Sequence, residues 1–218
     1  MSALKKFLLA ALVAQILFSN VAAAVEIIDK PIKWTANRER LIREYTLEHY
    51  GFEATEIEPR AVVVHWTAFG SCDSTYRYFY AEAFDSGIDA GTLNVASHFL
   101  VDRDGTIYRL TSETALNRHA IGYNWCAIGI ENVGGVDGAE DLTVAQLQAN
   151  VELIKYLHEK YPTIEYVFGH YQQVEAKKSG LFIELVPDYF AGKPDPGKIF
   201  MRHLRDYLEG DGLKFFPI

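Results

Sequence analysis

Two histidines and a glutamate stand where short apolar segments of the sequence end, and an aspartate lies in a proline-rich turn. His65 ends the run Ala-Val-Val-Val-His, Glu131 ends Ile-Gly-Ile-Glu, His170 ends Val-Phe-Gly-His, and Asp195 lies in Lys-Pro-Asp-Pro-Gly. Two imidazoles and one carboxylate are the ligand set of a catalytic zinc site whose fourth position is open to water. We therefore predict that His65, His170 and Asp195 bind one zinc ion.

The neighbouring polar residues indicate how such a site would act. Zinc lowers the pKa of water to about 7, so hydroxide becomes available at neutral pH. Glu131 is a candidate acid/base that takes a proton from water and passes it to a leaving amine. Lys193 lies two residues before Asp195, so its cation can share the same cleft and stabilise a tetrahedral oxyanion. These residue types predict hydrolysis of an amide.

Each of these residues also has a structural interpretation. Asp195 precedes Pro196, which is typical of a helix N-cap followed by proline at the first helical position, and capping competes with ligation for one carboxylate. Glu131 is alternatively a surface carboxylate at a strand end. His98 fits a packed histidine better than a ligand, and the histidines on expected helices fit structural roles: His49, His158 and His203.

Apolar periodicity predicts strands at 61–67, 97–101, 107–110, 127–132 and 165–169, and helices at 36–50, 74–86, 143–161 and 199–208. Asp104-Gly105 marks a hairpin turn between the second and third strands. Thr143 and Gln146 form a capping box at the start of the third helix. The order of elements predicts a single α/β domain, with a central mixed sheet flanked by helices and the zinc site at the strand ends.

Composition limits the classes of protein and of partner. The chain has 218 residues, 49% hydrophobic and 23% charged, which fits one globular domain with a sizeable core. Its net charge is −8, and it has no cluster of lysines and arginines. These features argue against nucleic acid as a partner and against a polybasic membrane anchor. No coiled-coil pattern is visible, and we expect a monomer.

Residues 1–24 have the pattern of a signal peptide. Lys5 and Lys6 form a basic segment, residues 7–18 are apolar but too short for a comfortable membrane span, and residues 22–24 are alanines. A buried N-terminal helix is the alternative. Cleavage after residue 24 removes two lysines and no acid, which changes the net charge from −8 to −10. We expect an exported protein, periplasmic or secreted, in which residues 25–59 form a helical segment of the same domain as residues 60–210.

Export gives the two cysteines, Cys72 and Cys126, a possible role. An oxidising compartment allows a pair of cysteines to form a disulfide. Cys72 follows the strand that ends at His65, and Cys126 precedes the strand that ends at Glu131. If these strands are neighbours, the two loops are able to meet. Two free thiols are the alternative.

Six motifs, in order, resemble those of the type 2 N-acetylmuramoyl-L-alanine amidases, zinc enzymes whose fold is shared with peptidoglycan recognition proteins and phage amidases. The resemblance covers about residues 60–205, most of the chain. The motifs read Val-Val-Val-His65-Trp-Thr-Ala, Ser-His98-Phe-Leu-Val-Asp-Arg-Asp-Gly-Thr-Ile-Tyr, Asn-Arg-His119-Ala-Ile-Gly, Ala-Ile-Gly-Ile-Glu131-Asn-Val-Gly-Gly, Val-Phe-Gly-His170 and Lys193-Pro-Asp195-Pro-Gly.

The resemblance implies one Zn²⁺ ion, peptidoglycan as the partner, and hydrolysis of the amide between the lactyl group of N-acetylmuramic acid and L-alanine of the stem peptide. It assigns roles to six residues: zinc ligands His65, His170 and Asp195, catalytic acid/base Glu131, transition-state stabiliser Lys193, and substrate-groove residue His119. Two alternatives remain. One is a binding module of the same fold that holds muropeptides without cutting them, and the other is a zinc hydrolase of a different amide.

The sequence departs from the family pattern at two places. Some members carry a catalytic tyrosine where Ser97 stands, and those members tend to lack the glutamate, so Glu131 is expected to take that role. The segment 171–192 is longer than expected between the second histidine and the Lys-Pro-Asp motif. Because Glu184 and Asp188 lie in this segment, they compete with Asp195 as the third ligand.

Overall fold

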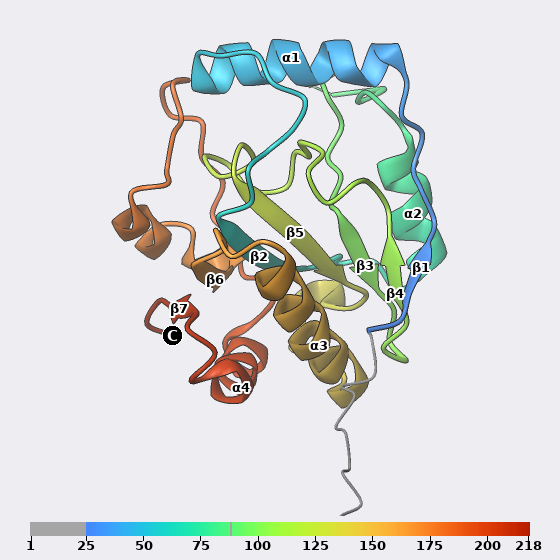
Figure 1. Ribbon diagram of the computed structural model, residues 1–218. Helices are drawn as coiled ribbons and strands as arrows, with labels where there is room; N and C mark the ends of the chain where they lie inside the picture. The colour runs from blue at the N-terminus through green and yellow to red at the C-terminus, as the bar shows by residue number, and fades with distance from the viewer. Residues whose placement is uncertain (1–24, 88) are drawn as a thin grey trace, which may run out of the picture.

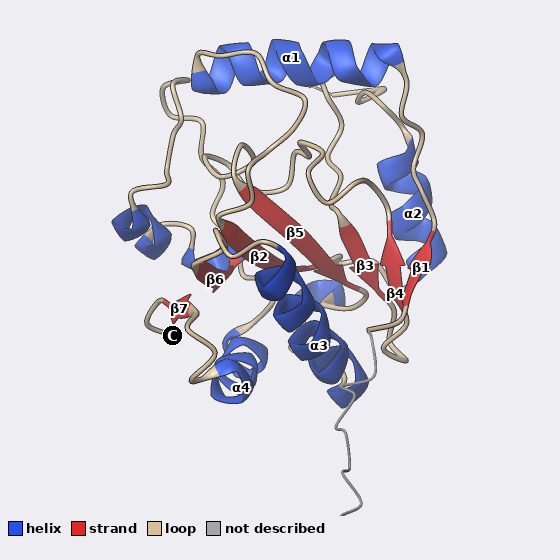
Figure 2. Ribbon diagram, viewed as in Figure 1, coloured by secondary structure: helices blue, strands red, loops and turns tan. Residues whose placement is uncertain are grey.

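The structure is a computed structural model that describes residues 25–87 and 89–218. The predicted signal peptide, residues 1–24, lies outside the described residues. The described chain forms one α/β domain (Figures 1 and 2), with its elements in the order β1 (Ile27–Asp29), α1 (Ala36–Tyr50), β2 (Ala61–Trp66), α2 (Cys72–Tyr80), β3 (Phe99–Val101), β4 (Ile107–Arg109), β5 (Ala127–Asn132), α3 (Val144–Lys160), β6 (Tyr166–Gly169), α4 (Lys198–Leu208) and β7 (Lys214–Phe215). None of the described helices combines the length and the apolar character needed to cross a bilayer.

These seven strands form one sheet in the order β1-β4-β3-β5-β2-β6-β7. The strands β3, β5, β2, β6 and β7 are parallel to one another. The strand β4 is antiparallel to β3, and β1 lies parallel to β4 at the edge. The predicted mixed sheet of an α/β domain is therefore confirmed, as is the hairpin that joins β3 to β4. In this order β2 lies between β5 and β6, and this position determines the site described below.

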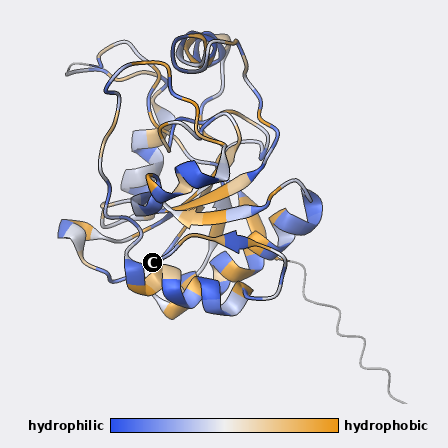
Figure 3. Ribbon diagram, turned by 90° about the vertical axis from the view of Figure 1, so that its left-hand side faces the viewer, coloured by the Kyte–Doolittle hydropathy of each residue, from blue (hydrophilic) through white to orange (hydrophobic). Residues whose placement is uncertain are grey.

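The side chains of β2 alternate between two buried faces of the sheet. Val62 and Val64 belong to the largest core cluster, which includes apolar side chains of α3 and α4, whereas Ala61 and Val63 belong to a second cluster. Burial on both faces explains why this strand reads as a continuous apolar run, and the central strands are among the most hydrophobic parts of the ribbon (Figure 3). Since successive side chains alternate, His65 lies on the same face as Ala61 and Val63.

Local capping signals determine the ends of two helices. Thr143 and Gln146 form the predicted capping box before α3: the Thr143 hydroxyl accepts from the Gln146 N–H at 3.1 Å, and Gln146 Oε1 accepts from the Thr143 N–H at 2.9 Å. At α1, Thr35 is the N-cap and Gly51 ends the helix in the left-handed conformation with φ 78°. Both helices lie within one residue of their predicted bounds at each end.

The second helix was predicted at 74–86 and lies instead at Cys72–Tyr80. Its early start follows from Ser71, whose hydroxyl caps the N–H of Ser74. Its early end depends on distant side chains: Arg38 donates to the carbonyls of Phe79 and Ala81, and Asn94 donates to those of Tyr78 and Ala81. Donors from other segments thus satisfy the last carbonyls of the helix. The local periodicity of the sequence does not reveal these donors, so it does not predict where the helix ends. The short edge strands β1 and β7 were also not predicted.

The two cysteines are buried free thiols, and the disulfide considered from the sequence does not form. β2 and β5 are indeed neighbours, but they are parallel. Cys72 follows the carboxyl end of β2 and begins α2, whereas Cys126 precedes the amino end of β5. The direction of the strands therefore places the two thiols at opposite ends of the sheet.

Candidate functional site

The register of three parallel strands brings three of the predicted site residues to one place. On β2, His65 is paired directly with Glu131 of β5, and Val64 is paired with Gly169 of β6. His170 therefore follows the end of β6 beside His65. All three residues lie at the carboxyl ends of the strands, where open α/β sheets place their sites.

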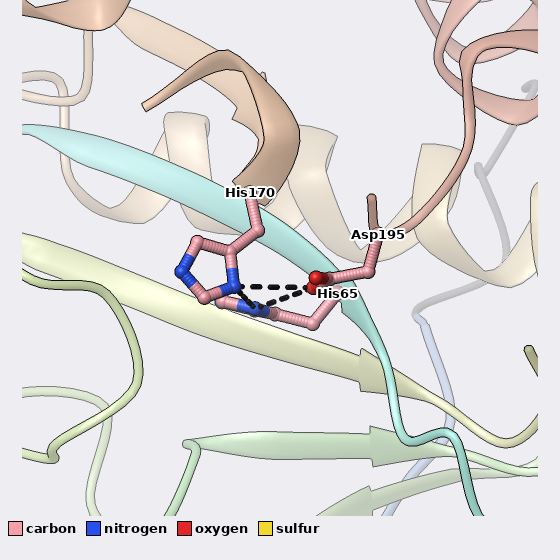
Figure 4. Close-up of side chains that lie close together, drawn as sticks. All are labelled: His65, His170 and Asp195. Atoms are coloured by element: carbon pink, nitrogen blue, oxygen red, sulfur yellow. Dashed lines mark hydrogen bonds and ion pairs between the residues drawn. The ribbon is translucent and has the colours of Figure 1, made fainter. Parts of the chain in front are cut away.

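Asp195 completes a compact triangle with the two histidines (Figure 4). His65 Nδ1 lies 3.0 Å from His170 Nδ1 and 3.1 Å from Asp195 Oδ2, and the third side of the triangle measures 3.2 Å. The three residues are buried, and they form the group of metal-binding type found among the described residues. A tetrahedral zinc ion with bonds of about 2.0–2.1 Å holds its ligand atoms about 3.3 Å apart. The observed spacing and the donor types therefore fit zinc.

The turn before α4 makes Asp195 available to this triangle. The N-cap of α4 is Gly197, without a side-chain capping bond, so the Asp195 carboxylate does not cap the helix. Its backbone carbonyl accepts from the Tyr171 N–H at 2.8 Å, which ties the turn to the residue after His170. Burial would raise the pKa of the Asp195 carboxyl, but the polar contacts with the His170 and His65 rings outweigh this and hold the pKa below its ordinary value.

Glu131 lies beside the triangle with an oxygen that has no hydrogen-bond partner in the part of the chain that the structure describes. Its Oε2 atom is buried and makes no hydrogen bond. Burial, and then the negative charge of Asp195, raise the pKa of the Glu131 carboxyl well above its ordinary value, whereas the nearby Lys193 cation opposes this effect. A carboxyl group in such surroundings is suited to accept and release a proton. The exposed Lys193 lines the same cleft.

Behind His65, on the side away from Asp195, lies His119. His65 Nε2 is 3.1 Å from His119 Nδ1, and His119 Nε2 donates to the carbonyl of Ala127 at 3.0 Å. Burial lowers the pKa of His65 to about 4, and burial followed by the proximity of His65 lowers that of His119 well below its ordinary value. His119 thus lines the cleft and also contacts a predicted ligand, and its contact with substrate stays a prediction.

Two of the histidines that the sequence predicts to be structural, His98 and His49, form hydrogen bonds or polar contacts within the protein. His98 Nε2 donates to the carbonyl of Ala115 at 2.7 Å, and His98 Nδ1 accepts from the Gly129 N–H at 2.9 Å. His49 Nδ1 lies 2.9 Å from Glu184 Oε1. Both rings are engaged by the protein and stand outside the metal-binding triangle.

A cleft of about 840 Å³ opens over the triangle, and the segment 171–192 supplies part of its wall through Tyr189, Phe190 and Ala191. Hydrogen bonds fasten this segment to the domain: the Leu185 N–H donates to the carbonyl of His49, and Arg118 donates to the Tyr189 hydroxyl. The long segment therefore shapes the groove. The two acids of this segment that were considered as alternative ligands, Glu184 and Asp188, are not members of the metal-binding triangle.

Two residues that support the site were not singled out from the sequence. The Asn124 side chain accepts from the N–H groups of His119 and Ala120, at 2.8 and 2.6 Å, and so fixes the backbone at His119. Gly129 leaves room for the His119 ring, because a Cβ atom there would lie 2.9 Å from the ring. A glycine inside a strand often marks a place where another group packs closely against the backbone. The position of Gly129 in the predicted strand could therefore have indicated such a contact.

Comparisons with known proteins agree with this geometry. The family model described as N-acetylmuramoyl-L-alanine amidase matches residues 55–198. The endolysin of Escherichia phage T7 is 39% identical over 77 residues, and that of Klebsiella phage KP32 is 35% identical over 77 residues. Each match covers 34% of this chain, and the chain spans about half the length of these curated relatives, 51%.

Solved structures share the fold at low sequence identity. An N-acetylmuramoyl-L-alanine amidase of Clostridium intestinale superposes with a TM-score of 0.53 at 20% identity, covering 87% of this chain and 99% of that one. Bumblebee PGRP-SA superposes with a TM-score of 0.53 at 18% identity, covering 88% and 98%. With a family model that matches most of its length and the fold of that family, the chain belongs to the N-acetylmuramoyl-L-alanine amidase family.

Proposed function

We propose that this protein is a zinc-dependent amidase that hydrolyses the bond between the lactyl group of N-acetylmuramic acid and L-alanine of peptidoglycan stem peptides. One observation carries the proposal: His65, His170 and Asp195 converge in the wall of a large cleft, beside a buried Glu131 oxygen that has no partner among the described residues. The family match and the phage endolysin relatives support the same reaction.

The chain's own residues divide the chemistry between them. His65, His170 and Asp195 would hold the metal. Bound zinc would act as a Lewis acid that lowers the pKa of a water molecule to about 7. Glu131 takes the proton of the water that attacks the lactyl carbonyl carbon. Glu131 then gives this proton to the nitrogen of L-alanine as the C–N bond breaks, which leaves a lactyl carboxylic acid and a free amine; the acid then ionises and the amine takes up a proton at neutral pH. Lys193 stabilises the negative charge that develops on the carbonyl oxygen.

The decisive assay uses purified protein and peptidoglycan fragments, with products identified by mass spectrometry. We expect free stem peptide that begins with L-alanine, lost with a chelator and restored by zinc. Fragments that bind but stay intact would instead support the recognition-module alternative. Cleavage of a different bond would support the proposed hydrolytic site but would contradict the proposed substrate.

Replacing Lys193 by alanine is expected to lower kcat by about 10²–10³-fold, the usual effect of removing one group that stabilises an oxyanion. The affinity for zinc should not change, because Lys193 is exposed and is not part of the triangle. Steady-state kinetics and a zinc titration measure the two effects separately. Lys198→Ala, at an exposed position on α4, is the matched control. A Lys193→Ala enzyme with normal kcat would remove Lys193 from the mechanism.

We also propose that the protein acts outside the cytoplasm, in the periplasm or as a secreted enzyme. The basic and apolar pattern of residues 1–24 supports export, and peptidoglycan lies in the compartment that an exported protein reaches. N-terminal sequencing of the protein isolated from its host tests this, since cleavage after Ala24 leaves Val25 as the first residue.

A further inference from the structure

His119 makes two ring contacts that together determine which nitrogen of His65 carries a hydrogen. The carbonyl of Ala127 only accepts hydrogen bonds, so the His119 Nε2 atom, 3.0 Å away, must be the N–H donor. A neutral imidazole protonated at Nε2 has a bare Nδ1 that accepts. The His65 Nε2 atom, 3.1 Å from this Nδ1, is therefore the donor. His65 Nδ1 is then left with its lone pair, directed toward His170 and Asp195.

The surroundings of His119 hold its ring in this position. Asn124, which is fully buried, accepts from the backbone N–H of His119 at 2.8 Å and donates to the Tyr45 hydroxyl at 3.0 Å. Gly129 lies against the ring, and a Cβ atom there would come within 2.9 Å of the ring's Cγ and Nδ1 atoms. A residue whose only role was to touch a ligand in the cleft would not need both of its ring nitrogens bonded to the protein.

We propose that His119 is a positioning residue that fixes the tautomer and the orientation of His65, so that His65 Nδ1 is ready to bind zinc. This inference rests on the proposed zinc site. It also changes the expected role of His119, because the protein occupies both ring nitrogens and leaves only ring carbons to touch a substrate. Outer partners of this kind typically change metal affinity by about 10–100-fold.

A pair of variants at position 119 separates the hydrogen bond from the volume of the side chain. Asn and Leu side chains branch at the same atom and have similar shapes, but only Asn offers an oxygen where His119 has Nδ1. We expect His119→Leu to bind zinc about 10–100-fold more weakly than the natural protein, and His119→Asn to recover most of this loss. The dissociation constant for Zn²⁺ is measured by competition with a chelating dye. Equal zinc affinity in the two variants would overturn the proposal.

A second variant moves the His119 ring without replacing it. Gly129 does not have a positive φ, so alanine fits its backbone, and the three atoms nearest to the added Cβ atom all belong to the His119 ring. Gly129→Ala is expected to weaken zinc binding, whereas Gly70→Ala, at a position with nothing within 4 Å of the added atom, should not. If His119→Leu fails to fold, this pair still tests the proposal, and unchanged zinc affinity in Gly129→Ala would count against it.

The tautomer itself is observable without metal or substrate. Long-range ¹H–¹⁵N NMR spectra of the zinc-free protein should show both His65 and His119 protonated at Nε2 and bare at Nδ1. In His119→Leu, the His65 signals should report a mixture of tautomers. His65 protonated at Nδ1 in the natural protein would refute the inference. These outcomes differ from failure of the proposed function, which would appear as a natural protein that binds no zinc or cleaves no amide.

Kinetics provide a final distinction from a substrate-contact role. If His119 acts by touching substrate, His119→Leu and His119→Asn should both raise KM and leave zinc affinity unchanged. If His119 acts through His65, the activity of His119→Leu should return when zinc is raised well above its new dissociation constant, with KM unaltered. The first pattern would overturn the proposal.

Discussion

A Glu131→Gln enzyme is expected to lose about 10²–10⁴-fold in kcat while its zinc stays bound, which is the usual contribution of one general acid/base. Glutamine preserves the size of the side chain but accepts no proton. Glu131 is not part of the metal-binding triangle. Among the described residues its buried Oε2 atom makes no hydrogen bond that the substitution would break. Metal content, thermal unfolding and kcat measured on one preparation together test this.

The matched control is Glu159→Gln, which makes the same chemical change at an exposed position on α3. It should leave kcat, zinc content and stability unchanged. Should Glu131→Gln keep full activity, Glu131 has no part in proton transfer. Loss of zinc from the same variant would instead assign Glu131 to the metal site.

His65→Ala is expected to abolish both zinc binding and hydrolysis, since it removes the ligand at the centre of the site. Thermal unfolding provides a readout that does not depend on activity. Zinc at 1,000 times its dissociation constant stabilises a folded protein by about 4 kcal/mol. For a domain of this size, about 1 kcal/mol corresponds to about 2–4 °C in Tm, so the natural protein should gain about 8–16 °C with zinc. The His65→Ala protein should gain nothing.

Asp195→Asn tests the same site with almost no change in volume, because it removes only the charge of the third ligand. It should also lose most of the zinc-dependent rise in Tm. His203→Ala, at an exposed histidine of α4, is the control and should keep the full rise. A natural rise in Tm that survives in His65→Ala would mean that zinc binds elsewhere on the protein.

The sequence by itself determined the local elements of this protein. The start of α3 was predictable because Thr143 and Gln146 lie within one turn of the chain and satisfy each other's backbone groups. The strand that carries His65 was predictable because burial on both faces requires a continuous apolar run. The sequence also placed polar residues at three strand ends, and its motifs indicated the family.

Tertiary structure decided which of these residues meet. His65 lies between Glu131 and His170 because β2 lies between β5 and β6 with parallel registers. Strand order depends on packing between segments far apart in the chain, and no local period of the sequence encodes it. The parallel direction of β2 and β5 also separates Cys72 from Cys126. Their positions in the sequence, close to these two strands, had suggested that they were able to form a disulfide.

Tertiary structure also decided between competing roles for single side chains. From the sequence, Asp195 was either a helix cap or a ligand. In the structure its carboxylate contacts the histidines, while Gly197 is the N-cap of α4 and Glu140 accepts from the Ile199 N–H in the first turn. His119 was predicted as a groove residue, and only the folded chain shows that it contacts both His65 and the backbone of β5. A polar atom chooses its partners by distance and direction, and both are determined only when the chain has folded.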